Sequence, residues 1–270
     1  MVSANGMSPD TWVDGPNRPL TFIYASAPNR GLEEVLRVWS YVYAQLGGSQ
    51  SGAVLEVYYG FTPGFEKQNR GTMRDYDEWK ARMEQLLAQE GVVYVGFVDA
   101  ARLAAAYAGA GFALYPTAFP ETSCIAMMKA MVPSPSLCCG GVCQPCADSV
   151  VCMQAMGAIP ISSRFRSSAL PELTPPWDLG PRTPRPGPGT PRHVQEQWLR
   201  EYADHVVAAA SGSLPVDALV AEARAAAAPL EAHRRAMKAW ARTTLTWDAV
   251  AKQWAHSLLH SAGKMHVGSQ

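Results

Sequence analysis

The sequence lacks the features that mark a membrane or secreted protein. Nowhere do about 18 apolar residues follow one another, as a membrane-spanning helix requires. The first residues carry Asn, Ser, Pro and Asp rather than the basic and then apolar stretch of a secretory signal. We therefore expect a soluble, cytoplasmic chain without such a signal.

An excess of one charge is also missing. Lysine plus arginine number 23 and so do aspartate plus glutamate, and no basic cluster carries interleaved aromatics, which argues against nucleic-acid binding. No Gly-x-Gly-x-x-Gly occurs, which counts against a dinucleotide-dependent oxidoreductase. With 48% apolar and 17% charged residues over 270 positions, the chain can bury one large domain or two small ones.

Cysteine is scarce outside one segment. Five of the six cysteines lie between Cys138 and Cys152, and only Cys124 lies elsewhere, so a disulfide scaffold is not indicated. The spacing of Cys143 and Cys146 could ligate zinc, but no second well-spaced pair or histidine lies nearby, and we expect no metal. A flexible surface insertion is the better interpretation. Because valine codons begin with GT and one glutamine codon ends with AG, residues 132–154 could also be a translated in-frame intron.

What is present is an alternation of strand and helix patterns. Strands are predicted at 20–25, 54–59, 92–95, 111–115 and 158–161 from short β-rich or apolar runs. Helices are predicted at 32–46, 75–89, 102–108, 122–131, 198–210, 217–228, 231–242 and 246–259. This order predicts an α/β fold with a Rossmann-like parallel sheet and helices on both faces.

The composition also predicts the domain organisation. Residues 1–19 have the composition of a linker, and 20–173 form the Rossmann-like domain, with an insertion at 131–154. Residues 60–71 are expected to form a loop with solvated charges. Proline and glycine dominate 174–195, which we expect to be an extended surface loop, and 196–262 supply the C-terminal helices of the same domain.

Three candidate residues lie in the segments that come just after predicted strands, namely Arg30, Gly96 and Glu121. Because the carboxyl ends of parallel strands share one edge, these residues are expected at the ligand crevice of the sheet. The turn before the first helix has a glycine, Gly31, at the helix start, where backbone N–H groups and the helix dipole can face an anion. The residues alone therefore predict a nucleotide-type site.

A family resemblance adds to this prediction. The stretch Glu121-Thr-Ser-Cys-Ile-x-x-Met-Lys-Ala, followed after the interruption by Gln154-Ala-Met-Gly-Ala-Ile-Pro-Ile, resembles the donor-binding signature of retaining glycosyltransferases. These are the family 4, or group 1, enzymes with the GT-B fold of two Rossmann-like domains. Their signature has two glutamates eight residues apart, whereas this chain has Glu121 and Lys129 at those positions.

The resemblance implies roles for further residues. Glu121 would be the central, catalytic residue and bind the donor sugar, and the N–H groups of Thr122, Ser123 and Cys124 would hold the diphosphate. Lys129 stands where the family contacts the donor ribose. The phrase Tyr24-Ala-Ser-x-Pro-x-Arg-Gly-Leu resembles the family's first strand-to-helix turn. In that turn the implied donor-binding residues are Ser26, Asn29, Arg30 and Gly31. The phrase Val-x-Tyr-x-Gly-Phe-Val would place Gly96 and Phe97 at the base pocket.

The implied activity is transfer of a hexose from a UDP- or GDP-sugar to a carbohydrate or other acceptor, with retention and without a metal or further cofactor. The family's acceptor-binding N-terminal domain would be missing, so we expect the chain alone to transfer no sugar. A second interpretation is a truncated or degenerate, non-catalytic module that binds a nucleotide or a partner. Lys129, the interrupted helix and the missing domain favour that alternative. A dinucleotide oxidoreductase is the third.

Overall fold

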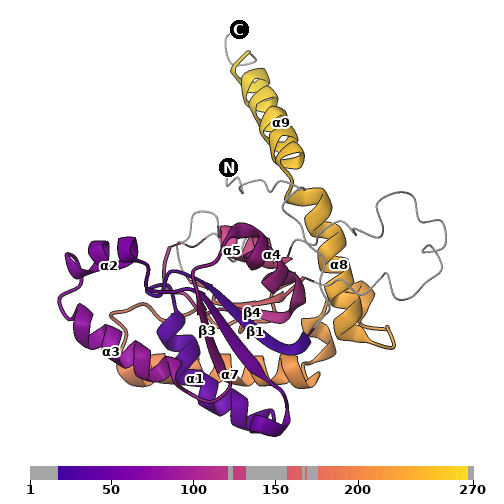
Figure 1. The fold of residues 1–270 in the computed structure, drawn as a ribbon. Helices are drawn as coiled ribbons and strands as arrows, with labels where there is room; N and C mark the ends of the chain where they lie inside the picture. Colours follow the sequence, from indigo (N-terminus) through magenta and orange to yellow (C-terminus); the bar gives the residue numbers. More distant parts are fainter. Residues whose placement is uncertain (1–17, 121–123, 132–156, 166–167, 169–175, 267–270) are drawn as a thin grey trace.

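A parallel β-sheet with the strand order β3-β2-β1-β4-β5 forms the centre of the protein in the computed structural model (Figure 1). The structure describes residues 18–120, 124–131, 157–165, 168 and 176–266. The strands are β1 (Arg18–Ser26), β2 (Val54–Tyr59), β3 (Val92–Gly96), β4 (Ala110–Tyr115) and β5 (Ile159–Ser162). All four neighbouring pairs are parallel, as predicted.

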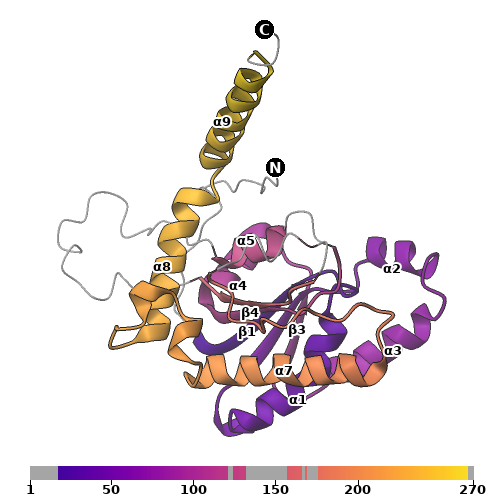
Figure 2. The same ribbon diagram turned by 180° about the vertical axis from the view of Figure 1, so that it is seen from behind.

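Helices cover both faces of the sheet (Figures 1 and 2). One face carries α1 (Leu32–Gln45), α3 (Tyr76–Leu87) and α7 (Arg192–Ser211). The other face carries α4 (Ala100–Gly109), α5 (Ile125–Met131) and α8 (Pro229–Thr244). Both views show α2 (Pro63–Arg70) at the periphery and α9 (Trp247–His266) pointing away from the sheet beyond α8. The predicted α/β class is therefore confirmed.

The core lies where the apolar face of α1 meets the middle of the sheet. Residues of α1 at helical spacing are buried, as the periodicity predicts. Phe22 of β1 stacks on Phe112 of β4 with ring centroids 5.5 Å apart, and Trp39 of α1 meets Phe22 edge-on at 5.4 Å. Such aromatic pairs add about 0.5–1.5 kcal/mol each beyond the area they bury. They fix β1 and β4, the strands that carry the candidate site, against α1.

Two local predictions are wrong. Residues 63–70, predicted as part of a loop, form α2, whose N-cap Thr62 accepts a hydrogen bond from the backbone N–H of Phe65 at 3.2 Å. Residues 217–228, predicted as a helix, form two 3₁₀ turns, Val216–Ala218 and Ala221–Ala223. Tertiary contacts override alanine propensity there, because Ala223 is buried and the backbone of the segment bonds to α8.

The proline-rich segment, predicted as a surface loop over 174–195, is irregular over residues 176–191, whereas 192–195 belong to α7, and its start is not on the surface. Trp177 and Leu179 are buried, and Leu179 N–H donates to the carbonyl oxygen of Pro160 in β5 at 3.0 Å. Asp178 accepts hydrogen bonds from the N–H groups of Ser162 and Gly180 at 2.9 and 2.8 Å. This part of the loop therefore covers the β5 edge of the sheet.

The opposite edge strand is β3. Its side chains Val93 and Tyr94 are 47% and 46% exposed, whereas every residue of β4 is buried. Tyr94 extends to the loop after β2, where its hydroxyl accepts a hydrogen bond from the N–H of Phe61 at 3.1 Å. The two edges of the sheet are thus protected to different degrees.

The predicted insertion begins where α5 ends and lies mostly outside the described residues. Gly157, the first described residue after it, returns to the end of the same helix. A Cβ placed on Gly157 would lie 2.8 Å from the carbonyl oxygen of Ala130 and 3.4 Å from that of Met131. The chain therefore leaves and re-enters the fold at neighbouring points.

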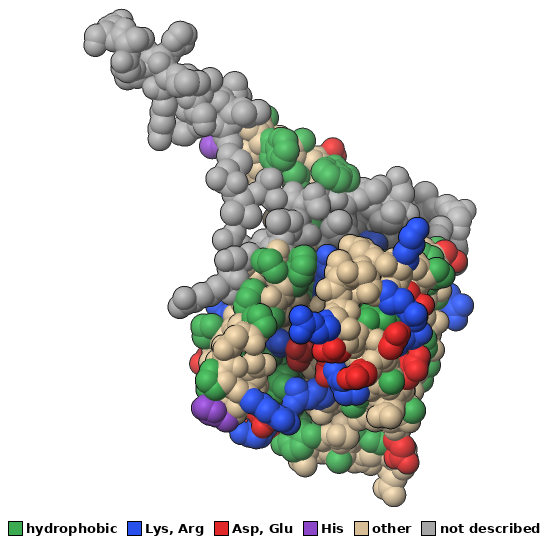
Figure 3. Space-filling model, turned by 90° about the vertical axis from the view of Figure 1, so that its left-hand side faces the viewer, with side chains coloured by type: hydrophobic (Ala, Val, Ile, Leu, Met, Phe, Trp, Pro, Cys, Tyr) green, Lys and Arg blue, Asp and Glu red, His purple; other side chains and the backbone are tan. Residues whose placement is uncertain are grey.

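The surface carries both signs of charge. Figure 3 shows Lys and Arg side chains interspersed with Asp and Glu on one face. Among the helices that the structure describes, none is both long and apolar enough to cross a bilayer.

Candidate functional site

The strand order reverses between β1 and β4, which are neighbours in the middle of the sheet. β1 continues into α1 on one face, whereas β4 leads toward α5 on the other face (Figures 1 and 2). Connections that diverge in this way leave a crevice at the carboxyl ends of the strands, which is where open α/β sheets bind ligands. The site is therefore expected between the β1–α1 turn and the β4–α5 loop.

The β1–α1 turn is held by hydrogen bonds to a single carbonyl. The oxygen of Ala27 accepts from the backbone N–H of Arg30 at 2.9 Å and from the Tyr24 hydroxyl at 2.8 Å. Burial raises the pKa of Tyr24 well above its ordinary value, so the phenol keeps the proton that it donates. The turn ends at Gly31, the N-cap of α1, whose φ of 106° is rare for any residue with a side chain.

Gly31 also brings the turn against the β4–α5 loop. A Cβ at this position would lie 2.9 Å from the carbonyl oxygen of Pro116 and 3.2 Å from the backbone nitrogen of Thr117. Real Cβ atoms essentially never approach closer than 3.0 Å, so glycine is required by contact as well as by φ. The two segments that border the crevice are in backbone contact.

Hydrogen bonds of Thr117 hold the start of the β4–α5 loop in place. Thr117 is fully buried, and its carbonyl oxygen accepts from the Ser163 hydroxyl at 2.5 Å. Its own hydroxyl oxygen accepts from the N–H of Phe119 at 3.0 Å. The loop thus leaves β4 in one defined direction, toward Phe119 and Pro120.

Arg185 clamps the loop to α1. Its guanidinium donates to the carbonyl oxygen of Pro116 at 2.6 Å and to the Glu34 carboxylate at 2.5 Å, and it lies 5.1 Å above the ring of Trp198. Only 9% of the Arg185 side chain is exposed. A buried, charge-assisted arrangement of this kind sets geometry as well as stability.

The turn and the loop enclose a cavity of about 280 Å³. Its lining comes from the β1–α1 turn, the first turn of α1, Met73 before α3, Trp79 in α3, the β4–α5 loop and Arg185. The residues are Pro28, Asn29, Gly31, Glu33, Glu34, Met73, Trp79, Ala118, Phe119, Pro120 and Arg185. Glu33 accepts from the indole N–H of Trp79 at 3.0 Å, and Glu34 pairs with Arg185. Each acidic side chain in the first turn of α1 therefore has its own partner.

Of the four predicted residues of the β1–α1 turn, two line this cavity, whereas Ser26 and Arg30 do not belong to its lining. Asn29 and Gly31 line it, and the Asn29 amide donates to the Asn69 side chain at 3.3 Å. The Arg30 guanidinium lies 4.1 Å from the ring centroid of Phe119, a cation–π contact between the turn and the loop. Ser26 lies behind them, with its hydroxyl 3.3 Å from that of Tyr115.

The other predicted residues lie apart or outside the described part. Gly96 ends β3, two strands from β1, and Phe97 follows it. The 70% exposed Phe97 meets Tyr59 edge-on at 6.2 Å. Cys124 is buried, and Lys129 is half-buried on α5. The remaining predicted residues, Glu121, Thr122 and Ser123, lie outside the described residues.

Sequence reasoning missed Glu34, Asn69, Trp79 and Arg185. Asn69 belongs to α2, which was predicted as a loop, and Arg185 lies 151 positions from Glu34 with no local pattern to mark it. No group of three or more His, Cys, Asp or Glu side chains that could hold a metal occurs within the described ranges.

Neither a protein-family model nor a curated protein matches the chain. Solved structures do match it. Sucrose-phosphate synthase from Thermosynechococcus elongatus has a TM-score of 0.56 at 15% identity, with 96% of this chain and 52% of that one covered. A GtfA/B complex has a TM-score of 0.53 at 15% identity, with 96% and 38% covered. A UDP-forming α,α-trehalose-phosphate synthase from Burkholderia xenovorans has a TM-score of 0.52 at 13% identity, with 90% and 44% covered.

The chain spans 38% to 52% of the length of these three structures. Their likeness covers the sheet and its helices together and confirms the predicted fold, the C-terminal half of a GT-B fold.

Proposed function

We propose that this chain is the donor-binding domain of a glycosyltransferase, which binds a nucleotide-sugar and contributes to transfer of its hexose with retention. The observation that carries the proposal is the backbone contact between the β1–α1 turn and the β4–α5 loop at the point where the strand order reverses. A fold likeness to the two sugar-phosphate synthases supports the same class of substrate.

The start of α1 is suited to a diphosphate. Its N-cap is glycine, so no side chain caps the first N–H groups of the helix, and these can donate to an anion that also benefits from the helix dipole. Arg30 would add a charge-assisted hydrogen bond. Glu33 and Glu34 are engaged by Trp79 and Arg185, which limits their repulsion of a bound anion.

The β4–α5 loop would then supply the sugar contacts. It runs past Phe119 toward Glu121, whose carboxylate we propose accepts hydrogen bonds from the hexose hydroxyls. The N–H groups at the start of α1 and the Arg30 guanidinium are donors that stabilise the charge developing on the departing diphosphate without reorganising, so we propose a reaction without a metal at this site. UDP-sugars are the first donors to test, because one of the matched enzymes is a UDP-forming synthase.

The test is a calorimetric titration of the 270-residue chain with UDP-glucose, GDP-mannose and the free nucleotides. Arg30→Met should weaken binding of both sugar nucleotide and free nucleotide by about 10- to 100-fold, because a charged hydrogen bond is worth about 1.5–3 kcal/mol. Glu121→Gln should weaken only the sugar nucleotide. The matched control is Arg235→Met, at an exposed arginine on α8.

No binding of any of these ligands by the wild-type chain would overturn the proposal. Sugar-nucleotide binding that Arg30→Met weakens but Glu121→Gln leaves unchanged would favour the second candidate, a non-catalytic nucleotide-binding module. One observation supports that candidate, namely that Lys129 lies on α5 in place of the family's second glutamate.

A further inference from the structure

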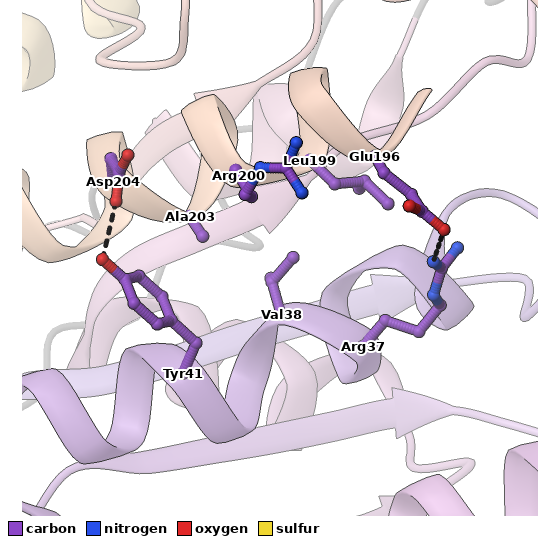
Figure 4. A pocket seen from close by; sticks show the side chains of 8 residues that line it. All are labelled: Arg37, Val38, Tyr41, Glu196, Leu199, Arg200, Ala203 and Asp204. Carbon is purple, nitrogen blue, oxygen red and sulfur yellow. Dashed lines mark hydrogen bonds and ion pairs between the residues drawn. The ribbon is translucent and has the colours of Figure 1, made fainter. Parts of the chain in front are cut away.

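A groove separate from the crevice runs between α1 and α7 (Figure 4). Its volume is about 350 Å³, within the range of small-molecule sites. It begins at Arg37, one helical turn beyond Glu34, and therefore shares α1 with the candidate site without sharing a lining residue. Its lining consists of Arg37, Val38, Tyr41, Glu196, Leu199, Arg200, Ala203 and Asp204.

The floor of the groove is apolar. Val38 of α1 and Leu199 and Ala203 of α7 are all buried where the two helices pack. The Tyr41 side chain lies beside this floor, and 45% of its surface is exposed (Figure 4). A ring-shaped ligand would thus find a small apolar surface and one accessible aromatic side chain.

The walls alternate hydrogen-bond acceptors and donors. Glu196, Arg200 and Asp204 recur at every fourth position of α7 and so lie on one row of that helix, with charges of alternating sign. Arg37 on α1 faces the Glu196 end, and Tyr41 faces the Asp204 end (Figure 4). The lining contains two guanidinium groups and two carboxylates, so its formal charge is zero.

Part of this hydrogen-bonding capacity is unused. The Oδ1 atom of Asp204 accepts from the Tyr41 hydroxyl at 2.8 Å, and the Oε1 atom of Glu196 takes both Arg192, at 2.6 Å, and Arg37, at 3.9 Å. Each carboxylate therefore has a second oxygen to offer. Within the part of the chain that the structure describes, Arg200 forms neither a hydrogen bond nor an ion pair, and it lies between the two carboxylates in the row. Arg192, by its hydrogen bond and its charge, and to a smaller extent the charges of Arg37 and Arg200 lower the pKa of Glu196, so Arg200 acts on this carboxylate through its charge alone.

We propose that the groove binds a neutral carbohydrate. A sugar presents neighbouring hydroxyls that each donate and accept, which matches guanidinium donors beside carboxylate acceptors, and its C–H face suits an apolar floor with a tyrosine. An inorganic anion would meet two carboxylates. A purely apolar ligand would desolvate four charged groups without replacing their hydrogen bonds. An apolar floor between charged walls of zero net charge therefore favours a polyhydroxyl ligand over both.

The test is saturation-transfer NMR and calorimetry with maltose, cellobiose, trehalose, sucrose and lactose. Each sugar is titrated to about 50 mM, which detects weak binding, since a Kd of that size corresponds to a binding free energy of about 2 kcal/mol. At least one sugar is expected to bind, and Arg200→Met and Asp204→Ala should each weaken it about tenfold or more. Arg82→Met, at an exposed arginine on α3, is the matched control and should leave the affinity unchanged. Because the substituted side chains lie on a helix surface, folding should be preserved, and melting curves check this.

The outcomes separate this site from the candidate crevice. Sugar binding that persists in Arg30→Met and in saturating UDP, and falls in Arg200→Met, supports the groove even if no nucleotide binds at the crevice. The proposal is overturned if no sugar of the panel binds. It is also overturned if Arg200→Met and Asp204→Ala leave the binding intact, or if sulfate displaces the sugar and binds more tightly, which would indicate an anion site.

Discussion

At the scale of single residues, Gly31 is constrained in two separable ways. Its φ of 106° disfavours any side chain, and the Pro116 carbonyl oxygen occupies the space that a Cβ would need. Gly47 offers a comparison within the same protein. It has nearly the same φ, 102°, but a Cβ there would meet only the Ser51 side chain, at an ordinary 3.6 Å.

We expect Gly31→Ala to lower the free energy of unfolding by about 2–4 kcal/mol, since the alanine adds a backbone clash to an unfavourable φ. Gly47→Ala should cost only about 1 kcal/mol, the conformational part alone. Urea denaturation of both variants measures the difference. Equal losses would mean that the turn and the loop are not in firm contact.

His233 is a second informative residue because it is buried and neutral. The Nδ1 atom accepts from the N–H of Val220 at 3.2 Å, so the ring proton resides on Nε2, which donates to the carbonyl oxygen of Trp177 at 3.1 Å. Burial, as the main cause, lowers the pKa of His233 below its ordinary value of 6.5. The histidine thus joins α8 to both irregular segments that precede it.

This predicts a loss of stability on the acid side. As the pH falls from about 6.5 through the lowered pKa of the folded protein, the unfolded chain binds a proton that the folded chain does not, and the free energy of unfolding decreases. Melting temperatures between pH 7.5 and 5 should therefore fall less steeply in His233→Gln than in wild type, despite the lower starting stability of the variant. His193→Gln, at an exposed histidine on α7, should retain the wild-type slope. A parallel profile for His233→Gln would refute the assignment.

At the scale of elements, local patterns predicted most of the sheet. The strands at 54–59 and 111–115 were found to within one residue, because buried β-rich runs between turn residues carry their own signal. The failures arose where distant contacts decide. Helix α2 is short, and Phe65 packs against Phe61 and Trp79, with ring centroids 6.0 and 6.4 Å away, which a local reading does not reveal.

The candidate site divides in the same way. Its β1–α1 turn is continuous in sequence, and the glycine at the helix start predicted an anion-binding site there. Arg185 could not be predicted, because it reaches Pro116 from a proline-rich loop that follows a different strand. The chain fold, rather than any motif, brings these residues together.

The insertion after α5 yields a prediction at this scale. With Gly157 already against the Ala130 carbonyl oxygen, deleting residues 132–154 leaves only Ala155 and Met156 to join Met131 to Gly157. The helix could then continue to a glycine C-cap, satisfying carbonyl groups at its end. We expect the deleted protein to melt higher, by a few degrees for about 1 kcal/mol.

Differential scanning calorimetry of the two proteins decides the matter. A lower melting temperature for the deleted form would make the segment a structural part of the fold. Loss of that stability on adding a zinc chelator to the full-length chain would then support a zinc site at its cysteines.

At the scale of the whole molecule, the residues that the structure describes cover the β5 edge of the sheet more than the β3 edge. The proline-rich loop hydrogen-bonds to β5, and the Tyr202 hydroxyl of α7 donates to the Ile161 carbonyl oxygen of that strand at 2.7 Å. On the other side, β3 consists of Val-Val-Tyr-Val-Gly, without the lysine or proline that commonly blunts an edge strand.

The exposed β3 edge has a consequence for handling the protein in solution. An uncharged, β-rich edge strand is a template on which a second chain can add a strand, so this edge is where we expect aggregation to begin. Val93→Lys should slow the growth of light scattering at high protein concentration and leave the melting temperature almost unchanged, because Val93 is 47% exposed. Ala81→Lys, at an exposed residue of α3, is the control for added charge alone and should slow scattering less. If both variants slow it equally, net charge rather than edge pairing governs the colloidal stability of this protein.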